Sequence, residues 1–171
     1  MNTLRLRLSS LAQTNLFAHI LAQAIVHHGL RRVFFTAPLG LGKTTCIRAL
    51  VANLPGHEEA QVSSPSFSLC NIYPVEPPVV HADLYRLADS ITQDGFGVPG
   101  ELLESLEDPK TVVLLEWAEL LPTPLWPDHL IHCTISQDHK QDTNGRLISL
   151  AMHGYASQTL EATLAHTFPS V

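Results

Sequence analysis

Apolar residues recur with a helical period over a long stretch near the start of the chain, from about Leu11 to His28. One face of a 3.6-residue helix collects Leu16, Phe17, Ile20, Leu21, Ala24 and Ile25. Ser10 precedes Gln13 by three residues, which predicts a capping box in which each side chain satisfies the other's free backbone N–H. Gly29 is expected to end this amphipathic helix.

A strand, a glycine-rich turn and a second helix are predicted next. The run Val33–Thr36 is short, apolar and rich in residues that favour strands, and proline and glycine follow it. Helical spacing then returns before Pro55 and Gly56, at Ile47, Leu50, Val51 and Leu54.

The middle of the chain combines a long loop with two buried strands. Residues 58–79 break into serine, proline and short apolar pieces, with room for one strand. Two near-continuous apolar strands follow, Val79–Ala82 ending at Asp83 and Val112–Leu115 ending at Glu116, with a helical piece around 101–106 between them. Each strand therefore delivers a carboxylate at its C-terminal end.

The last third predicts strands at Leu130–Ile135 and Leu147–Met152, a turn near Asn144-Gly145 and a helix from about Ser157 to His166. Buried strands that alternate with helices imply a sheet covered on both faces. We therefore expect an α/β protein, a three-layer α/β/α sandwich with a largely parallel sheet and a late antiparallel hairpin. Residues 1–171 are expected to form a single domain.

Composition and charge narrow the possible functions. The 171 residues are 45% apolar, include three cysteines and contain no apolar run long enough for a membrane span, so a disulfide scaffold and a membrane protein are excluded. Residues 1–57 hold six cations and no acid, and the rest has a balance of −12. This balance disfavours stable independent tRNA binding. The acid-free start resembles a transit peptide, but polar residues interrupt it, so a folded first helix and a cytoplasmic protein are favoured.

The segment Ala37-Pro38-Leu39-Gly40-Leu41-Gly42-Lys43-Thr44-Thr45 lies between the predicted strand and helix, as a phosphate-binding loop must. Glycines let successive backbone N–H groups surround phosphate oxygens, and the helix directs its positive end at the anion. Lys43 can reach the β- and γ-phosphates, the Thr44 hydroxyl is a Mg²⁺ ligand, and Thr45 faces the neighbouring structure. The candidate nucleotide-binding residues of this loop are Leu39, Gly40, Leu41, Gly42, Lys43, Thr44 and Thr45.

Ala37 occupies the position of the first glycine in the full G-x-x-x-x-G-K-[ST] pattern. A methyl group is tolerated there if the local φ angle is negative. The alternative is a glycine-rich turn without a ligand, which the strand–turn–helix context disfavours.

Asp83 and Glu116 both suit a metal–nucleotide site, because Mg²⁺ is held by one or two carboxylates together with phosphate oxygens. Either one alone could instead cap a helix or pair with Arg86. The Asn-Lys-x-Asp tetrad of guanine-selective GTPases is absent from the sequence, so ATP is the expected nucleotide.

Four motifs in order make the chain resemble the bacterial TsaE family, the P-loop ATPase of tRNA threonylcarbamoyladenosine biosynthesis. They are the phosphate loop, Ser64-Pro65-Ser66-Phe67-Ser68-Leu69, His81-Ala82-Asp83-Leu84-Tyr85-Arg86-Leu87 and Glu116-Trp117-Ala118-Glu119. The resemblance implies a P-loop NTPase-like fold and a Mg²⁺-dependent ATPase. Beyond these motifs the last third matches weakly, with Arg146 at the family's C-terminal basic position.

The resemblance also assigns roles. Thr44 and Glu116 would hold Mg²⁺, Lys43 would serve the phosphates, and Asp83 would order or activate the attacking water near the γ-phosphate. The residues of the expected switch loop are Ser64, Pro65, Ser66 and Phe67, and Ser66 stands where the family usually has threonine. Trp117 would pack near the nucleotide or a partner, or else anchor the core. Thr14 would reach the base or ribose, or else be an ordinary first-turn residue.

The histidines and cysteines give no comparable signal. His129 and His132 are three apart at the edge of a predicted strand, where their side chains point to opposite faces. The cysteines lie in unrelated segments, so no structural zinc site is expected, and Cys46 is read as a small apolar packing residue.

The leading hypothesis is a slow ATPase whose nucleotide state regulates assembly with the threonylcarbamoyl transferase subunit and its non-catalytic paralogue. These partners would stimulate hydrolysis by ordering the 64–69 loop. A small-molecule kinase is the first alternative, although only Arg86 and Arg146 remain after Arg48 for a substrate clamp. A nucleotide-binding adaptor that never hydrolyses is the second.

Overall fold

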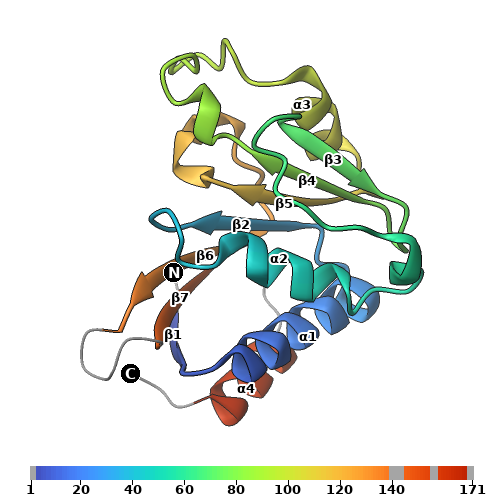
Figure 1. The fold of residues 1–171 in the computed structure, drawn as a ribbon, viewed down its shortest axis with the longest axis vertical. Helices are drawn as coiled ribbons and strands as arrows, with labels where there is room; N and C mark the ends of the chain where they lie inside the picture. Colours follow the sequence, from blue (N-terminus) through green and yellow to red (C-terminus); the bar gives the residue numbers. More distant parts are fainter. Residues whose placement is uncertain (1–2, 139–144, 155–157, 169–171) are drawn as a thin grey trace.

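The computed structural model describes residues 3–138, 145–154 and 158–168, and within them a seven-stranded sheet separates two helical layers (Figure 1). The strands run in the order β1-β7-β6-β2-β5-β4-β3. Their bounds are β1 Thr3–Leu8, β2 Arg32–Thr36, β3 Cys70–Tyr73, β4 Val79–Asp83, β5 Val112–Glu116, β6 Leu130–Gln137 and β7 Arg146–His153. The helices are α1 Leu11–His28, α2 Lys43–Val51, α3 Gly100–Glu107 and α4 Gln158–Thr167.

The four central strands are mutually parallel, and the two edges of the sheet are antiparallel. Strands β6, β2, β5 and β4 pair in parallel, as expected. Strands β6 and β7 form the predicted antiparallel hairpin, and β1 extends it. At the other edge β3 pairs antiparallel with β4, an antiparallel pair in the middle of the chain that the sequence pattern did not predict. The predicted turn at Asn144 and the start of the last helix at Ser157 lie outside the described residues.

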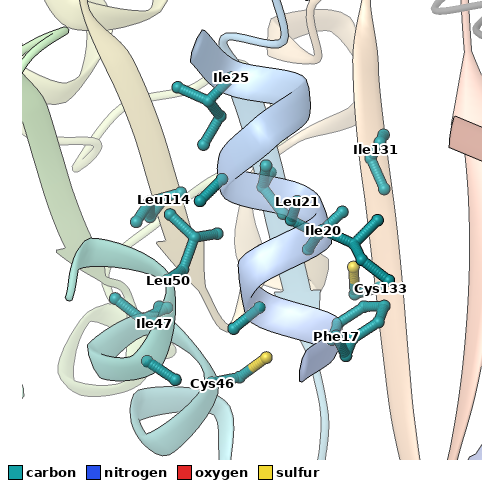
Figure 2. Packing of buried hydrophobic residues seen from close by; sticks show 14 of the residues in the cluster. Phe17, Ile20, Leu21, Ile25, Cys46, Ile47, Leu50, Leu114, Ile131 and Cys133 are labelled. Atoms are coloured by element: carbon teal, nitrogen blue, oxygen red, sulfur yellow. The ribbon is translucent and has the colours of Figure 1, made fainter. Parts of the chain in front are cut away.

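Alternating strand residues divide the core into two layers, one on each face of the sheet. Phe35 and Leu114 face α1 and α2, whereas Phe34 and Leu115 face the layer that contains α3. Figure 2 shows the first layer, where the side chains of Phe17, Leu21 and Ile25 from α1 lie among residues of α2 and the sheet. Each such fully buried side chain contributes about 1.5–3 kcal/mol. This layer fixes α2, and with it the glycine-rich loop that precedes α2.

Helix α1 begins and ends where the sequence predicts, but half of the capping box differs. The Ser10 hydroxyl accepts a hydrogen bond from the Gln13 backbone N–H at 3.2 Å, and Gly29 ends the helix with φ +70°. The Gln13 side chain reaches back one residue further than expected, to the backbone N–H of Ser9 at 2.6 Å. Leu16, expected on the buried stripe, is exposed. None of the helices in the described part of the chain combines the length and apolarity that a bilayer crossing needs.

The cysteine thiols are expected to be unreactive in the folded protein. Burial raises the pKa of Cys46 to about 12 and the pKa of Cys133 well above its ordinary value, and burial also raises the pKa of Cys70 to about 11. Only the thiolate attacks a disulfide reagent. At pH 8 we therefore expect titration with an aromatic disulfide to be slow for all three thiols, and fast after denaturation. Rapid labelling of Cys46 in the native state would contradict this packing.

Candidate nucleotide site

The glycine-rich loop has the backbone shape that a phosphate cradle requires. Gly40 and Gly42 have φ angles of +79° and +98°, a region that side chains with a Cβ atom rarely adopt. A Cβ atom at Gly40 would meet no other atom within 4 Å, so the space beside this residue of the loop is open. Helix α2 begins directly after Gly42, at Lys43. Its free backbone N–H groups therefore face the space that the loop encloses.

Ala37 fits the loop without strain. Its side chain is buried and packs in the core layer beneath α1 and α2, and Ala37 is not among the described non-glycine residues with positive φ, which are Leu69 and Trp117. The backbone therefore does not need glycine here, which confirms the condition set by the sequence analysis.

Lys43 is held by the loop that it follows. Its Nζ atom donates to the backbone oxygens of Ala37 at 2.7 Å and Pro38 at 3.3 Å, and it lies 4.1 Å from the centre of the Trp117 ring. Burial lowers the pKa of the Lys43 ammonium below its ordinary value, and nearby carboxylates, Glu116 foremost, oppose that shift. The ammonium has three N–H donors and two of them serve these carbonyls, so a third can donate to a phosphate oxygen from this position.

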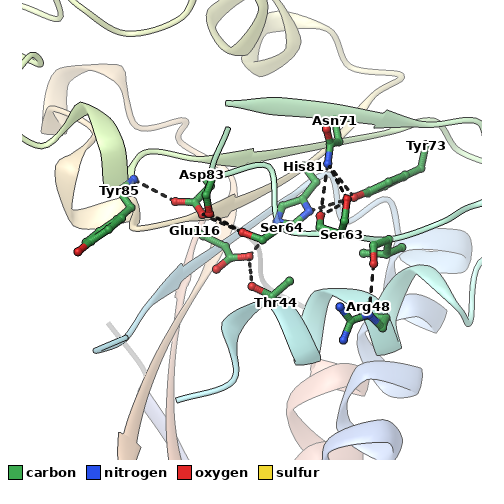
Figure 3. A network of polar contacts seen from close by, with 12 residues as sticks. Thr44, Arg48, Ser63, Ser64, Asn71, Tyr73, His81, Asp83, Tyr85 and Glu116 are labelled. Carbon is green, nitrogen blue, oxygen red and sulfur yellow. Dashed lines mark hydrogen bonds and ion pairs between the residues drawn. The ribbon is translucent and has the colours of Figure 1, made fainter. Parts of the chain in front are cut away.

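Thr44 and Glu116 meet at the centre of the site (Figure 3). The Thr44 hydroxyl donates to Glu116 Oε1 at 2.7 Å, which joins the first turn of α2 to the end of β5. Asp83 ends β4 and lies opposite Glu116 in the parallel register. The two acids were predicted separately from the ends of two strands. They are neighbours at the C-terminal ends of β4 and β5, and both are buried.

Both oxygens of Asp83 have partners. Oδ2 accepts from Ser66 at 2.8 Å and from Ser64 at 3.2 Å, and Oδ1 accepts from the Tyr85 backbone N–H at 2.9 Å. The last contact ties Asp83 to the start of the short 3-10 turn Tyr85–Leu87, but the N-cap residue of this turn is Leu84 and no side chain caps it, so Asp83 is not its N-cap. Arg86, the other partner considered for Asp83, lies instead over the ring of Phe67, with its Cζ atom 4.1 Å from the ring centre.

A cavity of about 210 Å³ collects most of the predicted phosphate and metal residues. It is lined by Leu39, Gly40, Gly42, Lys43, Thr44, Thr45, Ser64, Ser66, Asp83, Tyr85, Glu116 and Trp117. Trp117 is half-buried, and its ring contacts both Lys43 and Tyr85, with ring centroids of Trp117 and Tyr85 4.8 Å apart. Trp117 therefore lies on the side of the cavity and also packs against the α3 layer.

A second cavity, of about 490 Å³, opens on the other side of the glycine-rich loop. Thr14 and Arg146 line it together with Leu41 and the turn at Ser9 and Ser10. Arg146 Nε donates to the Leu41 backbone oxygen at 3.1 Å, which ties β7 to the loop. Thr14 also donates through its hydroxyl to the Ser10 backbone oxygen at 3.3 Å, as a first-turn residue does. The two cavities share Gly40, Gly42 and Thr45, so an elongated ligand could cross the loop from one to the other.

The remaining residues of the predicted switch loop have different positions. Pro65 is buried, and its backbone oxygen accepts from the Leu69 N–H at 2.6 Å. Phe67 is 85% exposed and is not among the residues that line the 210 Å³ cavity. The serines of the loop therefore face Asp83, while the phenylalanine faces outward.

Sequence reasoning gave no individual role to His81 and Tyr73. His81 is fully buried, and its Nε2 atom lies 2.9 Å from Glu116 Oε1, while the Tyr73 hydroxyl lies 3.3 Å from His81 Nδ1 (Figure 3). The available signal was the spacing of His81 and Asp83, two apart on one strand, which puts both side chains on the same face of the sheet.

Glu119, the second acid of the Glu116-Trp117-Ala118-Glu119 motif, is placed outside the 210 Å³ cavity. It accepts from the Thr36 hydroxyl at 2.7 Å, and His132 Nε2 lies 2.9 Å from the same hydroxyl oxygen. Burial lowers the pKa of His132 below its ordinary value. Glu119 and His132 thus hold Thr36, which immediately precedes Ala37, the first residue of the glycine-rich loop.

The residues present fit a magnesium nucleotide. The Thr44 hydroxyl and the Glu116 carboxylate are hard oxygen donors, as Mg²⁺ prefers, and the open loop next to them offers backbone N–H groups to phosphates. No group of three or more His, Cys, Asp or Glu side chains suited to a metal is found among the described residues.

Comparison with known proteins identifies the family of this chain. Residues 8–147 match the family model described as threonylcarbamoyl adenosine biosynthesis protein TsaE. The chain is 31% identical over 102 residues to the tRNA threonylcarbamoyladenosine biosynthesis protein TsaE of Mycobacterium tuberculosis, an alignment that covers 57% of this chain and 60% of the relative. It is 32% identical over 126 residues to the protein of the same name from Rickettsia bellii, covering 69% of this chain and 79% of the relative.

A solved structure with the same fold is the crystal structure of YdiB from Bacillus subtilis, with a TM-score of 0.68 and 20% identity over 96% of this chain and 95% of that one. The sheet, its two helical layers and the glycine-rich loop before α2 define a P-loop NTPase-like α/β protein. The family match covers most of the chain, and the chain belongs to the TsaE family. Its alignment spans about 60% of the length of the mycobacterial relatives.

Proposed function

We propose that this protein binds ATP with Mg²⁺, hydrolyses it slowly, and acts in the biosynthesis of threonylcarbamoyladenosine in tRNA. The observation that carries the proposal is the 2.7 Å contact between the Thr44 hydroxyl and Glu116, with Asp83 beside it and an open glycine loop in front. Membership of the TsaE family, whose curated relatives are named for this pathway, supports the biological role.

Each residue has a defined task in this proposal. Magnesium would neutralise charge on the phosphates and orient them. Thr44 and Glu116 would hold it, and the loop N–H groups with Lys43 would bind the phosphate oxygens. Asp83 would accept a hydrogen bond from the attacking water and orient it toward the γ-phosphate. The 490 Å³ cavity, lined by Thr14 and Arg146, would take the nucleoside.

The hydrogen bonds that Asp83 accepts support the proposal that hydrolysis is slow in this protein alone and is stimulated by a partner. Both of its oxygens already accept hydrogen bonds, so neither is fully available to a water molecule. A partner that orders the loop in an arrangement in which Ser64 and Ser66 no longer contact Asp83 would free Oδ2. Leu39 and Phe67 are 73% and 85% exposed near this loop, and they offer an apolar contact. The proposed partners are the threonylcarbamoyl transferase subunit and its non-catalytic paralogue, with assembly governed by the bound nucleotide.

The proposal is tested by measuring phosphate release from ATP by this protein alone and with the two transferase proteins, alongside a screen for phosphorylated acceptors. We expect weak release alone and a severalfold stimulation by the partners. Transfer of phosphate to a metabolite would favour a kinase and overturn the proposal. Nucleotide-dependent partner binding without any turnover would favour an adaptor that does not hydrolyse.

Replacing Glu116 with alanine is expected to raise the Mg²⁺ concentration needed for tight ATP binding by about tenfold or more, because one of two protein ligands is lost. The measurement is a Mg²⁺ titration at fixed ATP, followed calorimetrically. Glu104→Ala, on the exposed face of α3, is the matched control and should titrate like the unmodified protein. An unchanged midpoint for Glu116→Ala would remove this residue from the metal site.

A further inference from the structure

A chain of buried polar groups leads from the metal side of the site to the loop that carries Ser64 and Ser66 (Figure 3). It begins at Glu116 Oε1, which lies 2.9 Å from His81 Nε2. It continues from His81 Nδ1 to the Tyr73 hydroxyl at 3.3 Å, and from that hydroxyl to the Ser63 backbone oxygen at 3.1 Å. Three adjacent strands, β5, β4 and β3, each contribute one side chain.

The register of the sheet explains why these side chains meet. Strand side chains alternate between faces, so His81 and Asp83 of β4 share the face that is turned toward α2. Glu116 ends β5 opposite Asp83, and Tyr73 ends β3 opposite Val79, on the same face. The groups are therefore placed by backbone pairing rather than by flexible loops, which favours a precise arrangement.

Because they are buried, the hydrogen bonds that link Glu116, His81 and Tyr73 affect the free energy of folding more than exposed ones would. His81 is 0% exposed, and Glu116 and Tyr73 are also buried, so a lost partner would leave a polar group without water to replace it. A carboxylate only accepts, so His81 Nε2 carries the hydrogen of the contact with Glu116. That hydrogen bond fixes Oε1, which also accepts from Thr44.

We propose that His81 is a positioning residue that orients the Glu116 carboxylate for the metal, and that Tyr73 extends this control to the 63–66 loop. The proposal rests on the proposed Mg²⁺–ATP site. When Glu116 is held by a metal, His81 and Tyr73 are held with it, and the carbonyl of Ser63 stays docked. The 63–66 loop, whose serines contact Asp83, thereby senses whether the metal site is loaded.

Two substitutions of His81 separate its contact with Glu116 from its contact with Tyr73. His81→Gln places an amide N–H near the position of Nε2 and so keeps a donor for Glu116, but it has no group at Nδ1. His81→Asn places its amide near Nδ1, toward Tyr73, and leaves Glu116 without this donor. Tyr73→Phe removes the hydroxyl that reaches Ser63 and His81, while the second donor to the Ser63 backbone oxygen, Asn71 Nδ2 at 3.3 Å, stays in place.

The first measurement is the factor by which Mg²⁺ tightens ATP binding, from calorimetric titrations with and without the metal. We expect His81→Asn to reduce this factor about tenfold, the effect of one hydrogen bond to a charged group, and His81→Gln to restore most of it. His153→Gln, a half-buried histidine of β7, is the control and should leave the factor unchanged. An unreduced factor in His81→Asn would overturn the positioning role.

The second measurement follows the loop itself. Limited chymotrypsin cleavage after Phe67 is timed with and without Mg²⁺ and a non-hydrolysable ATP analogue, with cleavage after Phe96, which is 78% exposed, as an internal reference. We expect metal-bound nucleotide to slow cleavage after Phe67 severalfold in the unmodified protein. Tyr73→Phe and His81→Gln should bind the nucleotide but lose this protection. Retained protection in both variants would overturn the coupling.

These outcomes also distinguish the inference from the function on which it rests. If the unmodified protein binds ATP equally with and without Mg²⁺, the proposed metal site is wrong. If the unmodified protein responds to Mg²⁺ and the variants respond identically, only the roles of His81 and Tyr73 are wrong. Should His81→Asn fail to fold, as judged by its melting curve, Tyr73→Phe and His81→Gln still decide the coupling.

Discussion

Replacement of Lys43 by alanine is expected to weaken ATP binding by about 100-fold or more, which abolishes tight binding. The side chain places a buried ammonium beside the glycine-rich loop, bonded to the backbone oxygens of Ala37 and Pro38. A charged hydrogen bond to phosphate in such a site contributes about 3 kcal/mol, and each 1.4 kcal/mol is a tenfold change in affinity. Isothermal titration of the folded variant with ATP measures the effect.

The matched control for Lys43 is Lys110→Ala, which removes an exposed lysine in the turn before β5. It should bind ATP like the unmodified protein. Lys43→Ala should also keep a normal melting temperature in the absence of nucleotide, or show only a small change. ATP binding of ordinary strength by Lys43→Ala would show that the ammonium does not contact the phosphates.

Replacement of Asp83 by alanine is expected to leave ATP binding nearly intact and to lower turnover by about 10²–10⁴-fold. Asp83 lies beside Glu116 but is held by Ser64, Ser66 and the Tyr85 N–H. In the proposed reaction this carboxylate orients water rather than holding phosphate. Steady-state phosphate release with the partner proteins present, compared with the calorimetric ATP affinity, separates the two effects.

Asp89→Ala, an exposed aspartate six residues further along the chain, is the control and should retain turnover. Ser66→Ala provides a second check, because it removes one donor from Asp83 Oδ2 without removing the acid. If Asp83→Ala hydrolysed ATP at the ordinary rate, the water-orienting role would be disproved. If the variant lost ATP binding as well, Asp83 would belong to the binding residues instead.

The helices and buried strands of the fold were predictable because their apolar residues follow a clear period. Helix α1 has its predicted bounds, and β4 and β5 end at the predicted carboxylates. Strand β1 was not predicted. Its leucines alternate with Arg5 and Arg7, which is the pattern of a half-buried edge strand, but an acid-free, arginine-bearing start is also typical of a targeting segment.

The hydrophobic pattern also did not predict the direction of β3 in the sheet. This strand has four residues and a mixed burial pattern, so periodicity carries little information about it. Its antiparallel pairing with β4 follows from the short connection between Tyr73 and Val79, which is too short for a parallel crossover. Chain length between strands, rather than hydrophobicity, was the relevant signal.

The positions of the principal candidate site residues were predictable, because the loop sequence and the ends of the strands determine them. Glycine spacing identified the cradle, and the parallel register then brings Asp83 and Glu116 together. Their partners were not predictable to the same extent. The contacts of His81 with Tyr73 and of Arg146 with Leu41 join segments far apart in the sequence or depend on side-chain orientation, which a single sequence does not reveal.

The most direct test of the central claim is a calorimetric titration of the unmodified protein with ATP, performed with and without Mg²⁺. We expect one binding site per chain and an affinity at least about tenfold higher when the metal is present, because Thr44 and Glu116 then contribute to the complex. No detectable binding at millimolar ATP, or an affinity that Mg²⁺ does not change, would contradict it.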